Sequence, residues 1–245
     1  MTEKKTFITF AADTPRYPQL TKRVKIVCEQ AKSLRYFDKI IGYTDQDLKQ
    51  DTEYWGKYGN FIESNPRGYG FYMWKSHVVK RTMDEMNDND ILIYIDAGCT
   101  INSYGKKRLD EYVDMVRKSE HGIISFQMAH SSHKYTKKVV FDYLEVSPEG
   151  KKLDQFVAGI LILRKNENTK KIINEWNRIS TIPEMINDER SSSEHPEFID
   201  NRHDQSILSI LFYKYGSIIL KDETFFFPNW SNGLWAPFWA TRIKG

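Results

Sequence analysis

The sequence predicts an α/β fold: a single domain in which a mostly parallel central sheet is flanked by helices. Short apolar segments alternate along the chain with longer segments that carry apolar residues at helical spacing, which is typical of α/β domains. The segment 91–95 is apolar throughout, as in parallel strands that helices cover on both faces. No internal repeat or low-complexity linker divides the 245 residues, so we expect one domain over 1–245.

The first part of the chain contains three predicted strands and two predicted helices. The strands are expected at residues 7–12, 39–43 and 91–95, where apolar residues run together. The helices are expected at residues 18–36 and 70–86, because apolar side chains recur there every three or four positions. This order of elements builds parallel strands joined by helical crossovers.

The second part of the chain continues the alternation less regularly. We expect strands at residues 122–126 and 156–163, and helices at 108–116, 168–179 and 204–215. Residues 181–201 are mostly polar and are expected to form a long loop. The tail from residue 225 combines several aromatic residues with two prolines, which also indicates irregular structure.

Composition excludes several classes of protein. Lys and Arg total 36 against 33 Asp and Glu, a net charge of +3, which argues against a nucleic-acid partner. Two cysteines, Cys28 and Cys99, cannot build a disulfide framework and indicate reduced thiols in the cytoplasm. The longest apolar run, 156–163, is too short to span a membrane, and no signal-peptide region precedes the first strand.

One strong functional motif is an acid at the end of the apolar strand 91–95. Asp96 follows this strand directly, and two small residues, Ala97 and Gly98, come next. Ligands of open α/β sheets bind at the carboxyl ends of strands, where such a carboxylate can hold Mg²⁺ or Mn²⁺ beside phosphate oxygens. A simple turn cap is the alternative role for Asp96.

A second motif, residues 67–75, combines two glycines with cations and aromatic rings. Arg67 and Lys75 could contact a diphosphate, and Trp74 could stack on a ring. The glycines allow the backbone to turn or to approach a ligand closely. A turn in front of a helix whose Trp belongs to the core accounts for the same pattern.

Two further motifs lie in the second part of the chain. Asp204 and Gln205 open the predicted helix 204–215, either as a helix cap or as polar groups presented to a substrate. Ala158 and Gly159 are small residues inside an apolar strand, which marks close approach of a ligand or tight packing.

Other sites are disfavoured by the sequence. His130 and His133 are three residues apart, but the residues around them do not suggest a zinc site. No P-loop and no G-x-S-x-G elbow occur in the chain, which argues against a P-loop ATPase and an α/β-hydrolase.

Taken in this order, these motifs resemble those of GT-A-fold nucleotide-sugar glycosyltransferases, and in particular the retaining group that includes glycogenin and bacterial galactosyltransferases. Segments 67–75, 94–99, 203–208 and 240–242 are also similar to small glycosyltransferase-like proteins of bacteria and large DNA viruses. The resemblance spans almost the whole chain and implies a GT-A (Rossmann-like) fold. It implies a nucleotide-binding half over 1–100 and an acceptor-binding half over 101–245.

The resemblance also implies roles for individual residues. Asp96 stands where the family has the first aspartate of D-x-D, which binds a divalent metal on the donor diphosphate. Asp204 and Gln205 match the catalytic D-Q pair near the anomeric carbon. The remaining donor-binding positions that we expect are Phe10, Ala11, Asp13, Arg67, Trp74, Lys75, Ala158, Gly159 and Arg242.

The sequence departs from the family pattern at three places. Gly98 replaces the second aspartate of D-x-D, Val157 replaces an asparagine that usually contacts the sugar, and no histidine follows in the tail. We expect His203, or a water molecule, to take the place of the missing metal ligand. The need for Mn²⁺ or Mg²⁺ therefore stays open.

The expected function is transfer of a sugar from a nucleotide sugar, a UDP-sugar, to a hydroxyl of a glycan or glycoprotein, with metal assistance and retention of configuration. Asp204 would stabilise an oxocarbenium-like transition state, and Gln205 would contact the anomeric region. An inverting enzyme with Asp204 as general base is one alternative. A non-catalytic nucleotide- or sugar-binding module is another. A sugar-phosphate nucleotidyltransferase is disfavoured, because no Gly-rich loop follows the first strand.

Overall fold

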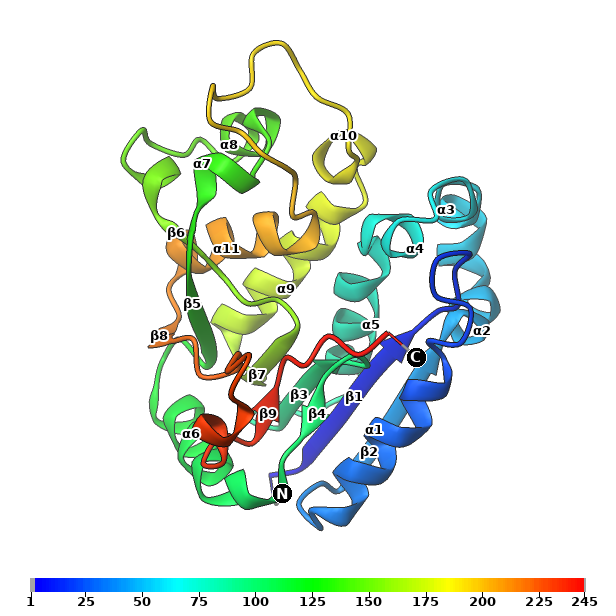
Figure 1. The fold of residues 1–245 in the computed structure, drawn as a ribbon, viewed down its shortest axis with the longest axis vertical. Helices are drawn as coiled ribbons and strands as arrows, with labels where there is room; N and C mark the ends of the chain where they lie inside the picture. Colours follow the sequence, from blue (N-terminus) through cyan, green and yellow to red (C-terminus); the bar gives the residue numbers. More distant parts are fainter. Residues whose placement is uncertain (1–2, 245) are drawn as a thin grey trace.

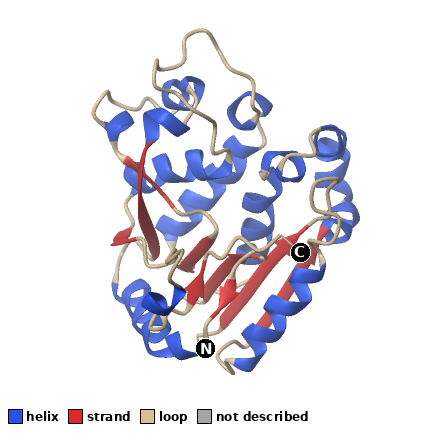
Figure 2. Ribbon diagram, viewed as in Figure 1, coloured by secondary structure: helices blue, strands red, loops and turns tan. Residues whose placement is uncertain are grey.

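The computed structural model describes residues 3–244 and confirms the predicted α/β fold (Figures 1 and 2). Its strands are β1 (Lys5–Ala11), β2 (Lys39–Thr44), β3 (Ile91–Asp96), β4 (Thr100–Ile101), β5 (Ile123–Ser131), β6 (Asp154–Phe156), β7 (Ile160–Arg164), β8 (Ile218–Lys221) and β9 (Phe238–Trp239). Its α-helices are α1 (Lys22–Ser33), α2 (Asp45–Gln50), α3 (Thr52–Ser64), α4 (Gly68–Phe71), α5 (Met73–Asp84), α6 (Lys106–Lys118), α7 (Ser132–Tyr135), α8 (Lys138–Tyr143), α9 (Glu167–Ser180), α10 (Pro183–Ile186) and α11 (Asp204–Tyr215).

One sheet of seven strands runs through the described residues in the order β2-β1-β3-β7-β5-β6, with β8 on β5. The strands β1, β2, β3, β5 and β8 point one way, while β7 and β6 run against them. The sheet is therefore mostly parallel, as predicted. Strands from both the 1–100 and the 101–245 regions belong to it.

Helices cover both faces of the sheet, which explains why β3 is apolar at successive positions. Leu92 and Tyr94 face one core cluster together with side chains of α5, α9 and α11. Ile93 and Ile95 face a second core cluster with side chains of α1 and α6. This alternation follows from the two-residue period of a strand. Asp96, two residues after Tyr94, therefore faces the α5 and α11 side.

Several elements differ from the sequence prediction. The segment 156–163 was expected to be one strand, but it splits into β6 and β7 around residues 157–159, and β7 is antiparallel to β3. The helices α2 and α3 were not predicted. The tail pairs with the chain after β3, because β9 and β4 form a small antiparallel sheet. In the described part of the chain, no helix combines the length and the apolar character that a membrane crossing requires.

Candidate active site

Three charged side chains from three elements meet at the end of β3. The ammonium Nζ of Lys75 on α5 lies 3.1 Å from Oδ1 of Asp96 and 3.1 Å from Oδ2 of Asp204 at the start of α11. The side chains of Lys75 and Asp204 are 4% and 5% exposed, whereas that of Asp96 is 40% exposed. The structure thus brings three predicted site residues together, and Asp96 is the member that solvent can reach.

The sheet fixes the position of Asp96. The hydroxyl of Tyr94 on the same face of β3 donates a hydrogen bond of 2.6 Å to Asp96 Oδ1. Because β3 and β7 are antiparallel, the start of β7 lies beside the end of β3, and the Asp96 N–H donates to the Gly159 carbonyl at 2.8 Å. A Cβ atom on Gly159 would lie only 2.7 Å from Asp96 Oδ2. Gly159 therefore leaves room for the Asp96 carboxylate.

A left-handed turn places Lys75. Residues 68–72, which include α4, all have positive φ, and three of them, Tyr69, Phe71 and Tyr72, are not glycine. Such residues cost about 1–2 kcal/mol each in this conformation. The turn is held by backbone bonds such as Phe71 N–H to Arg67 O at 2.8 Å. It leads directly into α5, whose first turn carries Lys75. Strained backbone of this kind clusters at functional sites.

The start of α11 carries the predicted D-Q pair. The Asp204 carbonyl accepts a bond of 3.0 Å from the indole N–H of Trp176, which ties the start of α11 to α9. The side-chain amide of Gln205 donates to Gln155 Oε1 at 2.7 Å, and Gln155 is fully buried in β6. The Gln155 amide in turn donates to the Tyr135 carbonyl at 3.1 Å. Gln205 is therefore oriented by a buried neighbour.

Burial and charge shift the ionisation of the site. Burial lowers the pKa of Lys75, but the nearby carboxylates of Asp204 and Asp96 outweigh this effect and raise the pKa above its usual value. Burial raises the pKa of Asp204 to about 6, against the opposing effect of Lys75. Burial also raises the pKa of the Tyr94 phenol. At neutral pH the Lys75 ammonium therefore faces an ionised Asp204 carboxylate.

Other predicted donor-binding residues lie in the core or have structural contacts. Phe10 and Trp74 are buried and stack on one another with ring centroids 3.8 Å apart, so neither ring is free to stack on a nucleoside base. Ala11 and Ala158 are also buried. Asp13 is exposed after β1, and its carboxylate accepts a bond of 2.7 Å from the Thr21 N–H just before α1.

Arg67 and His203 hold the loop in front of α11. The Arg67 guanidinium pairs with Asp188 at 2.9 Å and with Asp200 at 2.7 Å, so both carboxylates compete with a diphosphate for it. His203 is buried, its Nδ1 lies 2.7 Å from the Ile186 carbonyl, and its Nε2 lies 3.6 Å from Asp188. Burial lowers the pKa of His203. The ring nitrogens of His203 thus face α10 and its following loop.

The C-terminal segment passes over Gly98. The Ile243 N–H donates to the Gly98 carbonyl at 2.9 Å, and the Thr241 hydroxyl donates to the same carbonyl at 2.9 Å. A Cβ on Gly98 would lie 3.0 Å from the Ile243 carbonyl oxygen and 3.6 Å from the Arg242 Cα. In Figure 1 this segment crosses the sheet and ends near the carboxyl end of β1. Arg242 is exposed, its backbone lies beside Gly98, and its guanidinium lies 4.8 Å from the centre of the Phe225 ring.

The described side chains around Asp96 do not by themselves form a complete site for a divalent cation. Asp96 Oδ1 already receives the Tyr94 hydroxyl and the Lys75 ammonium, and Gly98 offers no carboxylate. Within residues 3–244, one group of three possible metal-binding side chains has its ligand atoms within 4.8 Å of one another. That group lies elsewhere in the fold and contains neither Asp96 nor His203. A positive charge 3.1 Å from the carboxylate also repels a metal ion. The expected pairing of His203 with Asp96 as ligands finds no support.

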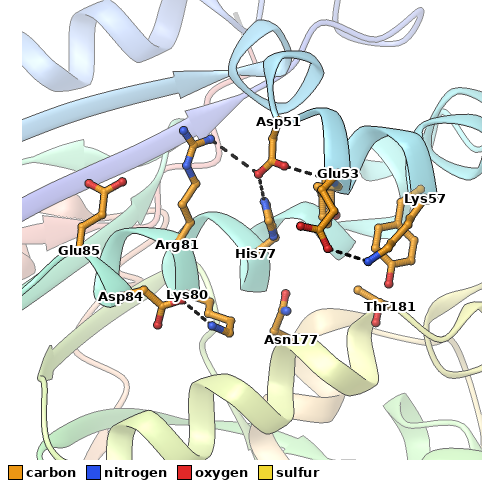
Figure 3. A pocket seen from close by; sticks show the side chains of 12 residues that line it. Asp51, Glu53, Lys57, His77, Lys80, Arg81, Asp84, Glu85, Asn177 and Thr181 are labelled. Atoms are coloured by element: carbon orange, nitrogen blue, oxygen red, sulfur yellow. Dashed lines mark hydrogen bonds and ion pairs between the residues drawn. The ribbon is translucent and has the colours of Figure 1, made fainter.

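Two surface hollows lie away from the triad. The first, of about 490 Å³, is lined by side chains of α3, α5 and α9, among which Asp51 contacts His77 at 2.9 Å (Figure 3). The second, of about 540 Å³, is lined in part by Asn65, Phe71 and Asp188. Neither contains Asp96 or Asp204, so we build the candidate site on the triad and its exposed Asp96 carboxylate.

Sequence reasoning missed two residues that support the site. Tyr94 holds Asp96, and the signal for it was present, because residues two apart on a strand share a face. Gln155 holds Gln205, but no sequence pattern connects two residues fifty positions apart. Both are buried polar side chains, and such groups find hydrogen-bond partners in a folded protein.

Comparisons with known proteins agree with this architecture. No protein-family model matches the chain, and no curated protein sequence matches it. Among solved structures, a glycosyltransferase involved in glycosylation of the major capsid of PBCV-1 superposes with a TM-score of 0.53 at 9% identity, over 96% of this chain and 91% of that one. Mouse xyloside xylosyltransferase 1 gives 0.48 at 11% identity over 100% and 95% of the two chains. The galactosyltransferase LgtC gives 0.47 at 10% identity over 98% and 87%. Together with the sheet order and the flanking helices, the first of these likenesses shows that the chain has the GT-A glycosyltransferase fold.

Proposed function

We propose that this protein transfers a sugar from a nucleotide-sugar donor, a UDP-sugar, to a hydroxyl group of a glycan. The observation that carries this proposal is the meeting of Asp96 and Asp204 around the Lys75 ammonium. The site lies at the carboxyl end of β3, where ligands of open α/β sheets bind. The GT-A fold supports the same chemistry, because its solved neighbours include glycosyltransferases.

The leaving diphosphate needs positive charge, and we propose that Lys75 and Arg242 supply it. Lys75 is fixed behind Asp96, and the exposed Arg242 lies in the segment that crosses Gly98. Preorganised cations stabilise charge that develops on a leaving group. We propose that Arg242 contacts the diphosphate directly and that Lys75 offsets the negative charge of the two carboxylates. In this account no protein-bound metal ion is required.

We propose that Asp204 acts on the sugar through its charge and not through direct proton transfer. Its carboxylate is buried and paired with Lys75, so it has no free path to deprotonate an acceptor hydroxyl. An ionised carboxylate close to the anomeric carbon instead stabilises an oxocarbenium-like transition state. We therefore propose a retaining reaction, in which Gln205, oriented by Gln155, contacts the anomeric region.

Donor binding tests the proposal. A thermal-shift panel of UDP-, GDP-, CMP- and dTDP-sugars should show a rise in melting temperature with one nucleotide class, since a ligand that binds only the folded state stabilises it. The rise should persist in EDTA and shrink in Arg242→Ala. If no nucleotide sugar or nucleoside diphosphate raises the melting temperature, the proposed function is wrong. If the rise depends on Mn²⁺, the account of Arg242 and Lys75 is wrong while the donor class stands.

A further inference from the structure

A second cluster of charged side chains lies outside the triad, where α7 meets the loop between α10 and α11. His133 belongs to α7, and His195 and Glu197 belong to that loop. One ligand atom from each of the three lies within 4.8 Å of the others. The imidazole rings of His133 and His195 have centroids 4.5 Å apart. Two segments that are remote in sequence thus present two imidazoles and one carboxylate to a common point.

Both ring nitrogens of His133 have polar neighbours. The Ser131 hydroxyl lies 2.9 Å from the Lys152 carbonyl, to which it can donate, and 2.8 Å from His133 Nδ1. His133 Nε2 lies 2.8 Å from Glu197 Oε2. When the ring proton is on Nδ1 and is donated to Ser131, Nε2 carries a lone pair beside the carboxylate. In this tautomer the imidazole and the carboxylate together can coordinate a metal ion.

We propose that His133, His195 and Glu197 bind a Zn²⁺ ion. Two imidazoles and a carboxylate, with water as the fourth ligand, form a set that suits tetrahedral zinc. The Nδ1 of His195 accepts the Glu197 N–H at a long 3.1 Å, so that nitrogen carries a lone pair that zinc can take instead. The Ser131 hydroxyl is the outer partner that orients His133, as ligating histidines usually require.

One neighbouring charge opposes the metal. The Lys134 ammonium lies 3.9 Å from Glu197 Oε2 and competes for the same carboxylate. It is partly exposed and stands on a flexible side chain, so it can swing into solvent when zinc enters. Removing this lysine should therefore tighten zinc binding.

The site would connect α7 to the loop that leads into Asp204. The same loop carries Asp188 and Asp200, which pair with Arg67 in front of the left-handed turn. Zinc would thus attach the part of this loop around residues 195–197 to α7, while Arg67 binds the parts that carry Asp188 and Asp200. Zinc binding here does not depend on glycosyl transfer, because His133, His195 and Glu197 lie outside the Lys75 triad.

Zinc binding to the full chain, prepared without a histidine tag and freed of metal, tests the site. Titration of Zn²⁺ against a chromophoric chelator should show one tightly bound ion per chain and a higher melting temperature with zinc. His195→Ala and Glu197→Gln should each weaken binding at least ~10-fold, and Ser131→Ala should weaken it about 10–100-fold as an outer partner. Lys134→Ala should strengthen it.

A matched control is His121→Ala. His121 precedes β5 and His133 follows it, so the two histidines flank opposite ends of one strand. This variant should bind zinc like the wild type, and the metal-free melting temperature of each variant shows whether it is folded. The proposal is overturned if the wild type binds no stoichiometric zinc, which would leave an ordinary hydrogen bond between His133 and Glu197. It is equally overturned if His195→Ala and Glu197→Gln bind as tightly as the wild type, or if His121→Ala loses as much affinity as they do.

Discussion

Lys75 lies at equal distance from Asp96 and Asp204, with its Nζ 3.1 Å from one oxygen of each. The ammonium is buried and is the cation that both carboxylates contact. Asp96 comes from a strand of the sheet, and Asp204 comes from a helix on its face. Lys75 therefore couples the stability of the site to its charge.

Replacing the central cation should damage both folding and turnover. Lys75→Met leaves Asp96 and Asp204 without their counter-charge, and loss of one partner of a buried ion pair costs about 3–5 kcal/mol. Denaturant unfolding should show this loss, and activity should disappear. Lys80→Met on the same helix is the control, because Lys80 pairs with Asp84 near the surface and should cost less than ~1 kcal/mol. Adding Asp204→Asn to Lys75→Met should recover part of the lost stability. If Lys75→Met and Lys80→Met lower the free energy of unfolding equally, the account is contradicted.

Turnover should depend on the ionisation of Asp204. Burial raises the pKa of Asp204 to about 6, and the ionised form is the one that stabilises a cationic sugar. Activity should therefore be full well above pH 6, about half-maximal near pH 6, and should fall further as the pH drops below it. The acid limb should disappear in Asp204→Asn, which should lose at least ~100-fold in kcat. A pH–rate profile measures both effects. If the acid limb survives in Asp204→Asn, a group other than Asp204 causes it.

Adding one methyl group at Gly159 should disturb Asp96 without unfolding the protein. The new Cβ would lie 2.7 Å from Asp96 Oδ2, so the carboxylate must move. We expect kcat to fall at least ~10-fold, as a small misplacement of a catalytic group can cost even more. Gly56→Ala is the matched control, because its Cβ would contact nothing within 4 Å and α3 should gain about 0.5–1 kcal/mol. Unchanged kcat in Gly159→Ala would remove Asp96 from the reaction.

Restoring the second acid of D-x-D should loosen the C-terminal segment. In Gly98→Asp the new Cβ would lie 3.0 Å from the Ile243 carbonyl oxygen, a backbone atom that must shift. Limited trypsin digestion should then cleave after Arg242 at least ~10-fold faster. A tenfold change corresponds to a free energy of local opening that is lower by about 1.4 kcal/mol. Equal cleavage rates in the wild type and the variant would show that the segment does not rest on Gly98.

The sequence was most informative where one local pattern decides the structure. The apolar run before Asp96 predicted a buried strand with an acid at its end, and β3 has this form. The same kind of run at residues 156–163 predicted one strand where there are two, because apolar character does not encode a break or a direction. The Gly68 and Gly70 pair indicated a turn, but not that Tyr69, Phe71 and Tyr72 would share the left-handed conformation.

Long-range contacts account for the rest of the differences. The sequence predicts Phe10 at the donor because it ends the first strand, and Trp74 because it is aromatic, but in the structure the two rings pack against one another. The glycine at position 98 stands where the family has a metal ligand, and its neighbour in space is the Ile243 backbone, a contact that the sequence does not indicate. Neither contact has a sequence signature, since the residues involved are far apart in the chain. Residue types can suggest chemistry, but packing decides which of them reach the site.

The most direct test is release of nucleoside diphosphate from a nucleotide sugar in the presence of EDTA. The account predicts that the wild-type chain releases diphosphate from one nucleotide class, and that Asp204→Asn binds the same donor but releases it at least ~100-fold more slowly. The matched carboxylate variant Asp188→Asn should retain release, because Asp188 contacts Arg67 and not Lys75. Binding without release in the wild type, or undiminished release in Asp204→Asn, would contradict the central role of the Lys75 triad.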